Sequence, residues 1–353
     1  MAEKIICESF SKASCGREAF LYTLSNKHGM VLKTTDFGAA IVSILIPEKN
    51  GGVKDVVLGF DSVSGYEKTG LYLGATIGRY AGQVRDAQFT LNGKTYSLYA
   101  NDHTNTLHGG QKGFDKRFFT ADICEAKNKI TFSYFSPSGE EGFPGNLQAA
   151  ASYQLTDQNE IIMSHTAKSD CDTILSMTNH AYYNLNGHAS GSIENHRLTI
   201  PATEFLELAP DCCPNGRILP VHNTPMDFTS PHTIGTRIAA DDEQLRISEG
   251  YDHNWNIAPT GSKYPLCAEL ENDSGSIRMQ MFSGLPGLQM YSGNYLNGSE
   301  AGKDGYRYGH RGALCLEPQF YPASPSYPQF PSPILKQNEI YKHKIIVKFF
   351  YSQ

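Results

Sequence analysis

Two segments of the chain place a histidine where it could bind and protonate a ligand. His108 precedes two glycines in 105–110 (Asn-Thr-Leu-His-Gly-Gly), so few side chains crowd it, although a loop histidine that caps a turn explains the segment equally well. His180 lies in 178–187 among three asparagines and two tyrosines, all of which hydrogen-bond hydroxyl groups. A buried structural histidine is the alternative there.

Two further segments supply carboxylates. Asp252 lies in 251–255 (Tyr-Asp-His-Asn-Trp), beside Trp255, the only tryptophan. An acid that accepts from hydroxyls and a ring that packs on C–H faces are a common sugar-binding combination; a solvated acid beside a core tryptophan is the simpler alternative. Glu317 ends the apolar run 313–316, where burial would raise its pKa above the usual value of about 4.3. A glutamate exposed at a strand end is again the alternative.

Several well-known catalytic signatures are missing from the sequence. There is no Walker A loop, Gly-x-Gly-x-x-Gly, His-Glu-x-x-His or Gly-x-Ser-x-Gly. The glycine-rich segment 74–82 lacks the phosphate-loop lysine. Nucleotide and serine-hydrolase chemistry therefore have no support.

Short alternating segments broken by turn residues predict that β-strands position these side chains. The run 89–98 has Asn92-Gly93 at its centre, a dipeptide that supplies the positive φ of a type I′ turn and predicts a hairpin. Alternation predicts a strand over 130–134, and 270–281 is interpreted as another hairpin. The run 341–351 is rich in β-branched and aromatic residues, which predicts a final strand.

Helical signals are almost absent, and 61–66 is the best candidate for a short helical turn. The 33 glycines and 18 prolines punctuate strands rather than mark one linker. The proline-rich segment 317–333 is also aromatic-rich, which predicts an ordered loop packed on the body. These patterns favour an all-β fold, a large antiparallel β-sandwich.

Composition excludes several classes of protein. The 353 residues suffice for one large core or two ordinary domains, and 40% apolar with 19% charged residues is a globular composition. A net charge of −6 without clustered Lys or Arg argues against nucleic acid and anionic membranes as partners. No signal peptide and no span of 18 apolar residues is visible. The eight cysteines contain no Cys-x-x-Cys pair, which predicts reduced thiols and a cytoplasmic location.

Taken in order, the four segments and 287–294 (Gly-Leu-Gln-Met-Tyr-Ser-Gly-Asn) resemble the aldose 1-epimerase (galactose mutarotase) family from about Ile41 to the C-terminus. The resemblance implies one galactose mutarotase-like supersandwich domain over 1–353, a monomer or homodimer that interconverts the α and β anomers of a free aldohexose such as galactose or glucose. It implies no metal or organic cofactor. It further implies Glu317 as catalytic base, His180 as catalytic acid, and three sugar-binding residues, His108, Asp252 and Gln289.

The sequence departs from the family pattern at one position of interest. Members usually have a second, sugar-contacting arginine where this chain has Gln83, in Gly78-Arg79-Tyr80-Ala81-Gly82-Gln83. Arg85 follows two residues later and, in a continuing strand, would face the same side. We therefore expect Gln83 and Arg85 to be sugar-binding residues, with weaker binding unless Arg85 compensates.

Three other functions use the same residues. His108, His180 and a carboxylate could mimic a two-histidine, one-carboxylate metal site. Asp252 and Glu317 could form the carboxylate pair of a glycosidase. A non-catalytic sugar-binding protein would need the binding residues without the pair of His180 and Glu317, so the presence of both favours catalysis.

Overall fold

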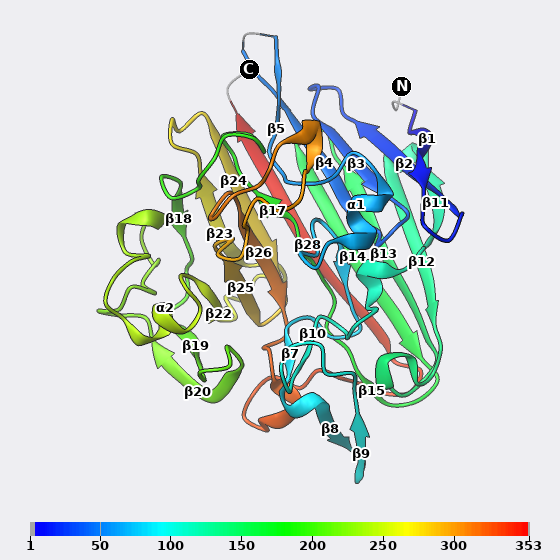
Figure 1. Cartoon of the computed structure of the whole chain (residues 1–353), viewed down its shortest axis with the longest axis vertical. Helices are drawn as coiled ribbons and strands as arrows, with labels where there is room; N and C mark the ends of the chain where they lie inside the picture. The colour runs from blue at the N-terminus through cyan, green and yellow to red at the C-terminus, as the bar shows by residue number, and fades with distance from the viewer. Residues whose placement is uncertain (1–3, 50, 352–353) are drawn as a thin grey trace.

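The computed structural model describes residues 4–49 and 51–351, and its architecture is built from three larger antiparallel sheets (Figure 1). The central sheet has nine strands in the order β11 (Thr120–Cys124), β12 (Lys129–Ser136), β13 (Leu147–Leu155), β14 (Glu160–Ser169), β28 (Ile340–Tyr351), β24 (Ile277–Ser283), β23 (Leu266–Glu271), β18 (Arg197–Thr199) and β21 (His232–Thr233). The C-terminal strand β28, red in Figure 1, thus lies in the middle of this sheet between strands from two distant parts of the chain.

Two further sheets complete the sandwich. The first five strands form one of them in chain order: β1 (Ile6–Lys12), β2 (Glu18–Ser25), β3 (Val31–Thr35), β4 (Ile41–Pro47) and β5 (Val53–Asp55). The other has six strands in the order β17 (Tyr182–Tyr183), β26 (Leu314–Gln319), β25 (Gly287–Tyr291), β22 (Asp252–Asn256), β19 (Glu204–Leu208) and β20 (Pro214–Pro220). The predicted all-β sandwich is therefore confirmed.

One apolar core joins these sheets. Alternate side chains along the strands point inward, as in β14, where Ile161 and Met163 are buried. They pack in the same cluster as Leu32 and Ile44 of the first sheet and Leu316 of the six-stranded sheet. Burial of so many branched and aromatic side chains supplies the main drive for folding.

The short strand pairs include the predicted hairpin of β8 (Gln88–Leu91) and β9 (Lys94–Ser97). Asn92 and Gly93 both have positive φ, 52° and 78°, as a type I′ turn requires. The other pairs are β7 (Gln83–Val84) with β10 (Thr106–Leu107), β6 (Thr76–Ile77) with β16 (Thr178–Asn179), and β15 (Thr173–Ile174) with β27 (Ile334–Leu335).

Helices are short. The predicted turn near 61–66 is α1 (Val63–Lys68). A second helix, α2 (Glu243–Ile247), was not predicted; Asp242 caps it by accepting from the backbone N–H groups of Gln244 and Leu245. Within the described residues, no helix has the length and apolar character needed to cross a membrane.

The proline-rich segment 317–333 was predicted as an ordered loop, which is wrong for 317–319, because these residues end strand β26, and is confirmed for 320–333. Tyr321 and Phe330 are buried and pack on Leu206 of β19. The hydroxyl of Tyr80 donates to the carbonyl of Tyr321 at 2.8 Å. The loop thus closes one side of the six-stranded sheet.

Candidate active site

A cavity opens over the six-stranded sheet, where the turns that carry His108 and His180 approach it. Its volume is about 700 Å³ including the open mouth, within the range of small-molecule sites. Six of the seven predicted site residues line it: Gln83, His108, His180, Asp252, Gln289 and Glu317. The sequence-distant segments singled out above therefore meet at one place.

Strand register brings the two carboxylates and Gln289 to one face. Gln289 of β25 lies directly opposite Glu317 of β26, and Asp252 of β22 lies opposite Tyr291 of β25. Nε2 of Gln289 donates to Oδ1 of Asp252 at 2.7 Å. Two oxygens of these side chains, Oε1 of Gln289 and Oε2 of Glu317, are buried and have no hydrogen-bond partner among the described residues.

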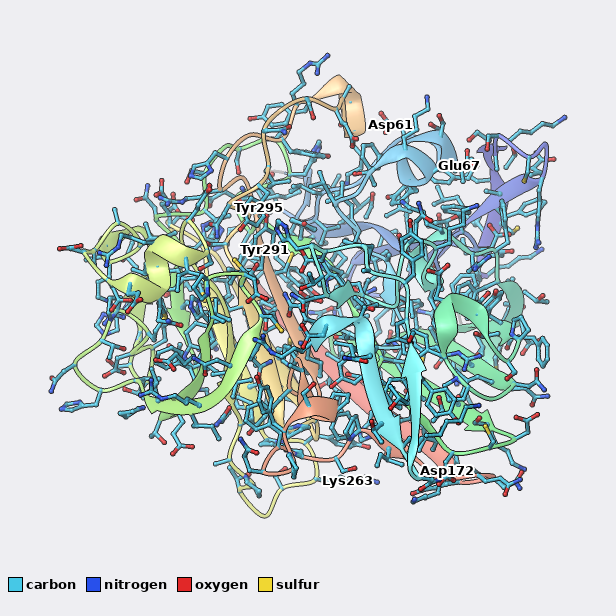
Figure 2. All side chains as sticks on the ribbon, turned by 60° about the horizontal axis from the view of Figure 1, so that its bottom comes forward. Asp61, Glu67, Asp172, Lys263, Tyr291 and Tyr295 are labelled. Atoms are coloured by element: carbon cyan, nitrogen blue, oxygen red, sulfur yellow. The ribbon has the colours of Figure 1, made fainter. Side chains whose placement is uncertain are left out.

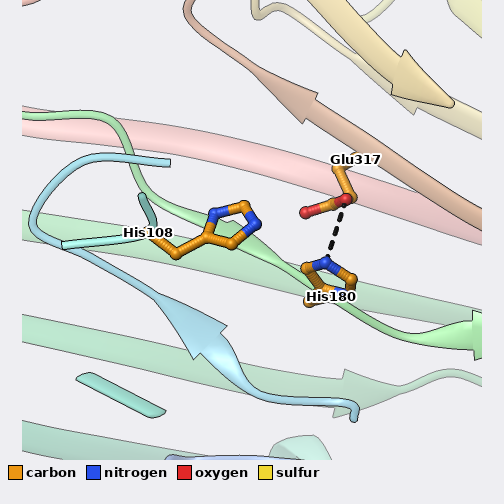
Figure 3. Close-up of side chains that lie close together, drawn as sticks. All are labelled: His108, His180 and Glu317. Carbon is orange, nitrogen blue, oxygen red and sulfur yellow. Dashed lines mark ion pairs between the residues drawn. The ribbon is translucent and has the colours of Figure 1, made fainter. Parts of the chain in front are cut away.

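His180 is fixed by its backbone and by both ring nitrogens. Its N–H donates to the carbonyl of Ala75, and its carbonyl accepts from Gly74, both at 2.9 Å. Nε2 lies 3.5 Å from Oε1 of Glu317, the pair marked in Figure 3. On the other side of the ring, Sγ of Cys315 lies 3.5 Å from Nδ1. The imidazole is thus held facing the carboxylate of Glu317.

His108 reaches the same point from a strained turn. It has a φ of 51° and is followed by Gly109 at 91°, where an added Cβ would lie 2.0 Å from the carbonyl oxygen of Gly78. Nδ1 of His108 accepts from the N–H of Gly82 at 3.2 Å. In the neutral ring the proton therefore sits on Nε2, as a donor on the part of the ring that faces the pair of His180 and Glu317 (Figure 3).

Burial shifts the pKa of every titratable group in the cavity toward the neutral form. It raises the pKa of Glu317 well above its usual value, with the charge of Asp252 adding to the shift. It raises the pKa of Asp252 to about 6, although the hydrogen bond from Gln289 opposes the change. Burial lowers the pKa of His180 to about 4. An ionised Glu317 is therefore an unusually strong base and a protonated His180 an unusually strong acid.

Tyrosines, rather than Trp255, form the aromatic wall of the cavity. Tyr72, Tyr182, Tyr291 and Tyr295 line it. Tyr291 and Tyr295, labelled in Figure 2, stack with ring centroids 5.9 Å apart. Trp255 lies three residues after Asp252 and so points to the opposite face of the strand. It is fully buried, and its Nε1 donates to the carbonyl of Met226.

The expectation that Trp255 packs on a sugar is therefore wrong, and the core-tryptophan alternative is confirmed for it. The other half of that alternative is wrong, because Asp252 is not a solvated surface acid: it lines the cavity beside Gln289. Glu317 is likewise not an exposed strand end, since every residue of β26 is buried.

The structure separates Arg85 from Gln83. The strand ends at Val84, and Arg85 begins a 3₁₀ turn, η1 (Arg85–Ala87). Its Nη2 donates to the carbonyls of Cys213 and Pro214 at 3.2 and 2.9 Å. The prediction that Arg85 shares the face of Gln83 is wrong, because it assumed a strand that continues through Arg85.

Besides the four tyrosines, the cavity has a polar residue, Gln319, that was not assigned from the sequence. Gln319 lines the cavity with no solvent exposure. It follows Glu317 by two residues on β26, so the strand period of two already predicts that it shares the face of Glu317.

The geometry keeps the metal-site alternative open. One donor atom from each of His108, His180 and Glu317 lies within 4.8 Å of the others. Two imidazoles and a carboxylate are ligands that several divalent ions accept. The same three groups suit proton transfer to and from a bound sugar, so chelation must distinguish the two.

With the fold and site established, comparison with known proteins identifies the family. The family model for aldose 1-epimerase matches residues 21–348. An aldose 1-epimerase of Escherichia coli K12 is 35% identical over 326 residues, 92% of this chain and 93% of that protein. The galactose mutarotase of Homo sapiens is 36% identical over 313 residues, 89% of each chain. The chain belongs to the aldose 1-epimerase family.

Solved structures agree with this assignment. The galactose 1-epimerase of Lactobacillus acidophilus has a TM-score of 0.87 at 26% identity, with 99% of both chains covered. An aldose epimerase homologue from C. elegans has a TM-score of 0.85 at 28% identity, with 95% of this chain and all of that chain covered. The sandwich described above is the fold of that family.

Proposed function

We propose that this protein catalyses the interconversion of the α and β anomers of a free aldohexose, with Glu317 as catalytic base and His180 as catalytic acid. His108, Asp252, Gln289 and Gln83 bind the sugar hydroxyls. Arg85 is not included, because its guanidinium is bonded to backbone carbonyls away from the cavity.

The proposed reaction needs two coupled proton transfers. Glu317 takes the proton of the C1 hydroxyl as the bond between C1 and the ring oxygen breaks. The electron pair of that bond passes to the ring oxygen, which takes a proton from His180. After rotation about the C1–C2 bond, His180 takes the proton back as the oxygen attacks the other carbonyl face, and Glu317 returns its proton to the C1 oxygen. No group is consumed.

The observation that carries the proposal is the buried pair of Glu317 and His180, 3.5 Å apart and facing a cavity lined with hydroxyl-binding groups. Their opposite pKa shifts make the base stronger and the acid stronger, which is what ring opening requires. The names of the related aldose 1-epimerase and galactose mutarotases support the same chemistry.

Polarimetry on freshly dissolved α-D-galactose and α-D-glucose tests the proposal. We expect the rotation to approach equilibrium faster than the spontaneous rate, in proportion to protein concentration, with denatured protein as the blank. No acceleration of either sugar would contradict it. The same preparation should release no nitrophenol from a nitrophenyl galactoside; release would favour the glycosidase pair of Asp252 and Glu317.

We also propose that the protein works in the cytoplasm as a monomer or homodimer. Its eight cysteines are all free thiols, which suits a reducing compartment. Fractionation of the source cells and light scattering of the purified protein test the two statements separately.

A further inference from the structure

Gln319 is a buried amide that the protein itself leaves unsatisfied. Its side chain has no solvent exposure, lines the cavity, and neither Oε1 nor Nε2 has a hydrogen-bond partner among the described residues. Leaving a buried polar atom unpaired destabilises a fold, so most such atoms are paired. An amide kept in this state beside an open cavity points to a partner that arrives with the ligand.

Another buried glutamine shows the usual arrangement. Gln244 of α2 accepts from the N–H of Leu208 at 2.7 Å and donates to the carbonyl of Leu208 at 3.2 Å. Asn254 resembles Gln319 in having both amide atoms unpaired, but it does not line the cavity. Gln319 therefore combines two properties, unpaired amide atoms and access to the cavity, that these other two amides do not combine.

The order of residues along β26 shows which part of the sugar Gln319 faces. Cys315, Glu317 and Gln319 alternate onto the cavity face. His180 contacts both Cys315 and Glu317, so it lies toward the Cys315 end of the strand. Gln319 lies on the other side of Glu317, where a Cβ added to Gly82 would be 3.2 Å from its Nε2.

The covalent structure of an aldohexose turns this order into an assignment. In the ring, C1 is bonded to the ring oxygen on one side and to C2 on the other. If Glu317 is at the C1 hydroxyl and His180 at the ring oxygen, the opposite side of Glu317 belongs to C2. A hydroxyl donates and accepts, so it can pair with either atom of the amide.

We propose that Gln319 hydrogen-bonds the C2 hydroxyl of the bound aldohexose and makes this hydroxyl a determinant of substrate choice. The assignment rests on the proposed roles of Glu317 and His180.

A cycle of two proteins and two sugars tests it: the wild type and Gln319→Met, each with D-galactose and 2-deoxy-D-galactose. Methionine has a similar length but no amide. We expect kcat/KM of the wild type to fall about 3- to 10-fold when the C2 hydroxyl is removed. In Gln319→Met, D-galactose should lose about the same factor, and the deoxy sugar should lose little more.

Thermal unfolding without sugar separates contact from structure. Because the side-chain amide of Gln319 bonds to no described residue, Gln319→Met should keep or raise Tm. The matched control is Gln244→Met, which should lower Tm and leave KM unchanged, since the side-chain amide of Gln244 bonds to Leu208, outside the cavity. If Gln319→Met does not fold, Gln319→Leu repeats the cycle.

The outcomes decide the proposal in either direction. Equal losses for the two sugars, or no change of KM in the variant, would overturn the C2 assignment while leaving the proposed activity intact. If the wild type does not accelerate mutarotation at all, the proposed function fails. The same cycle measured as sugar binding by calorimetry then still shows whether Gln319 contacts the C2 hydroxyl.

Discussion

Two buried polar clusters in this molecule differ in one respect that separates structure from function. Lys303 is 5% exposed, and its Nζ lies within 3.3 Å of four acceptors: the carbonyls of Val42 and Val57, Oγ of Ser43 and Oδ2 of Asp55. Oδ1 of Asp55 accepts from the N–H groups of Ile44 and Val57. Each of these charged atoms has a partner inside the protein.

The cavity cluster is equally buried and incompletely paired. Glu317 and Gln319 have exposures of 1% and 0%, yet Oε2 of Glu317 and both amide atoms of Gln319 have no partner among the described residues. Burial alone therefore does not mark a functional group. Unpaired polar atoms that also line a cavity do so, because a ligand can complete them.

The largest effect is expected at His180. His180→Asn keeps a hydrogen-bonding side chain but removes the proton donor, so kcat should fall about 10²- to 10⁴-fold, the usual contribution of general acid catalysis. Polarimetric time courses of mutarotation measure kcat of the variant and of the wild type. A variant with more than a tenth of the wild-type kcat would exclude His180 as the acid.

Chelation is the companion experiment at the same three residues. If proton transfer needs no metal, EDTA leaves the rate of the wild type unchanged. Loss of activity that a divalent ion restores would instead establish a metal held by His108, His180 and Glu317.

Lys303→Met tests the other half of the comparison. It leaves Asp55 without its cation, and breaking a buried ion pair destabilises a fold by about 3–5 kcal/mol. We expect a value near the lower end, about 3 kcal/mol, because Asp55 keeps two backbone N–H donors. Urea unfolding measures the loss, and kcat of the folded variant should be unchanged. An unchanged stability with a lower kcat would reverse the roles of the two clusters.

The pH dependence of KM should report Asp252. Its pKa is raised from 3.8 to about 6, so between pH 3.8 and about 6 the carboxyl is protonated in the folded protein and ionised in the unfolded chain. The stability it contributes is full below 3.8 and is lost as the pH rises through about 6. Because the carboxylate is the form that accepts from sugar hydroxyls, KM should be constant at neutral pH and rise as the pH falls below about 6. Steady-state polarimetry at a series of pH values measures KM.

Asp252→Asn supplies the control for this profile. The asparagine side chain does not titrate, so KM of this variant should be higher than that of the wild type at neutral pH and should stay constant across the same pH range. A rise of KM at acidic pH that persists in Asp252→Asn would belong to another residue.

A much smaller effect than at His180 is expected at Gln83. Gln83→Arg replaces a neutral donor by a charged one, and the difference of about 1–2 kcal/mol corresponds to KM lower by roughly tenfold, with kcat nearly unchanged. Arg85→Ala should leave KM unchanged in both backgrounds, since Arg85 bonds to carbonyls outside the cavity. An unchanged KM in Gln83→Arg would show that this segment does not contact the sugar.

The sequence predicted the all-β class and several strands because these depend on local patterns, whereas most of the cavity residues were predicted through the family resemblance. Richness in β-branched and aromatic residues identified the final strand 341–351, observed as Ile340–Tyr351. The dipeptide Asn92-Gly93 identified the hairpin of β8 and β9. Glu317 and His180 were paired only through the resemblance of the ordered motifs to the aldose 1-epimerase family, since each motif alone left a structural role open. What those motifs do not contain is the pairing of distant strands, and so the contact of Gln289 with Asp252 was not predictable.

The failures have equally physical causes. The side on which Arg85 lies depends on where the strand ends, which is at Val84. The guanidinium of Arg85 then bonds to the carbonyls of Cys213 and Pro214, more than a hundred residues away, and local sequence does not reveal such partners. Tyr72 lines the cavity with a backbone φ of 57°, a left-handed conformation that the local sequence does not predict. Gln319 could have been found, because it follows Glu317 by one strand period.

The most direct test of the account is Glu317→Gln, measured by polarimetry on α-D-galactose together with sugar binding by calorimetry. The change keeps the size and the hydrogen-bonding capacity of the side chain but removes the proton acceptor at C1. We predict that catalysed mutarotation falls by about 10²- to 10⁴-fold, while the Kd for galactose changes by less than about tenfold. Turnover close to that of the wild type, with sugar bound, would contradict the assignment of Glu317 as the base.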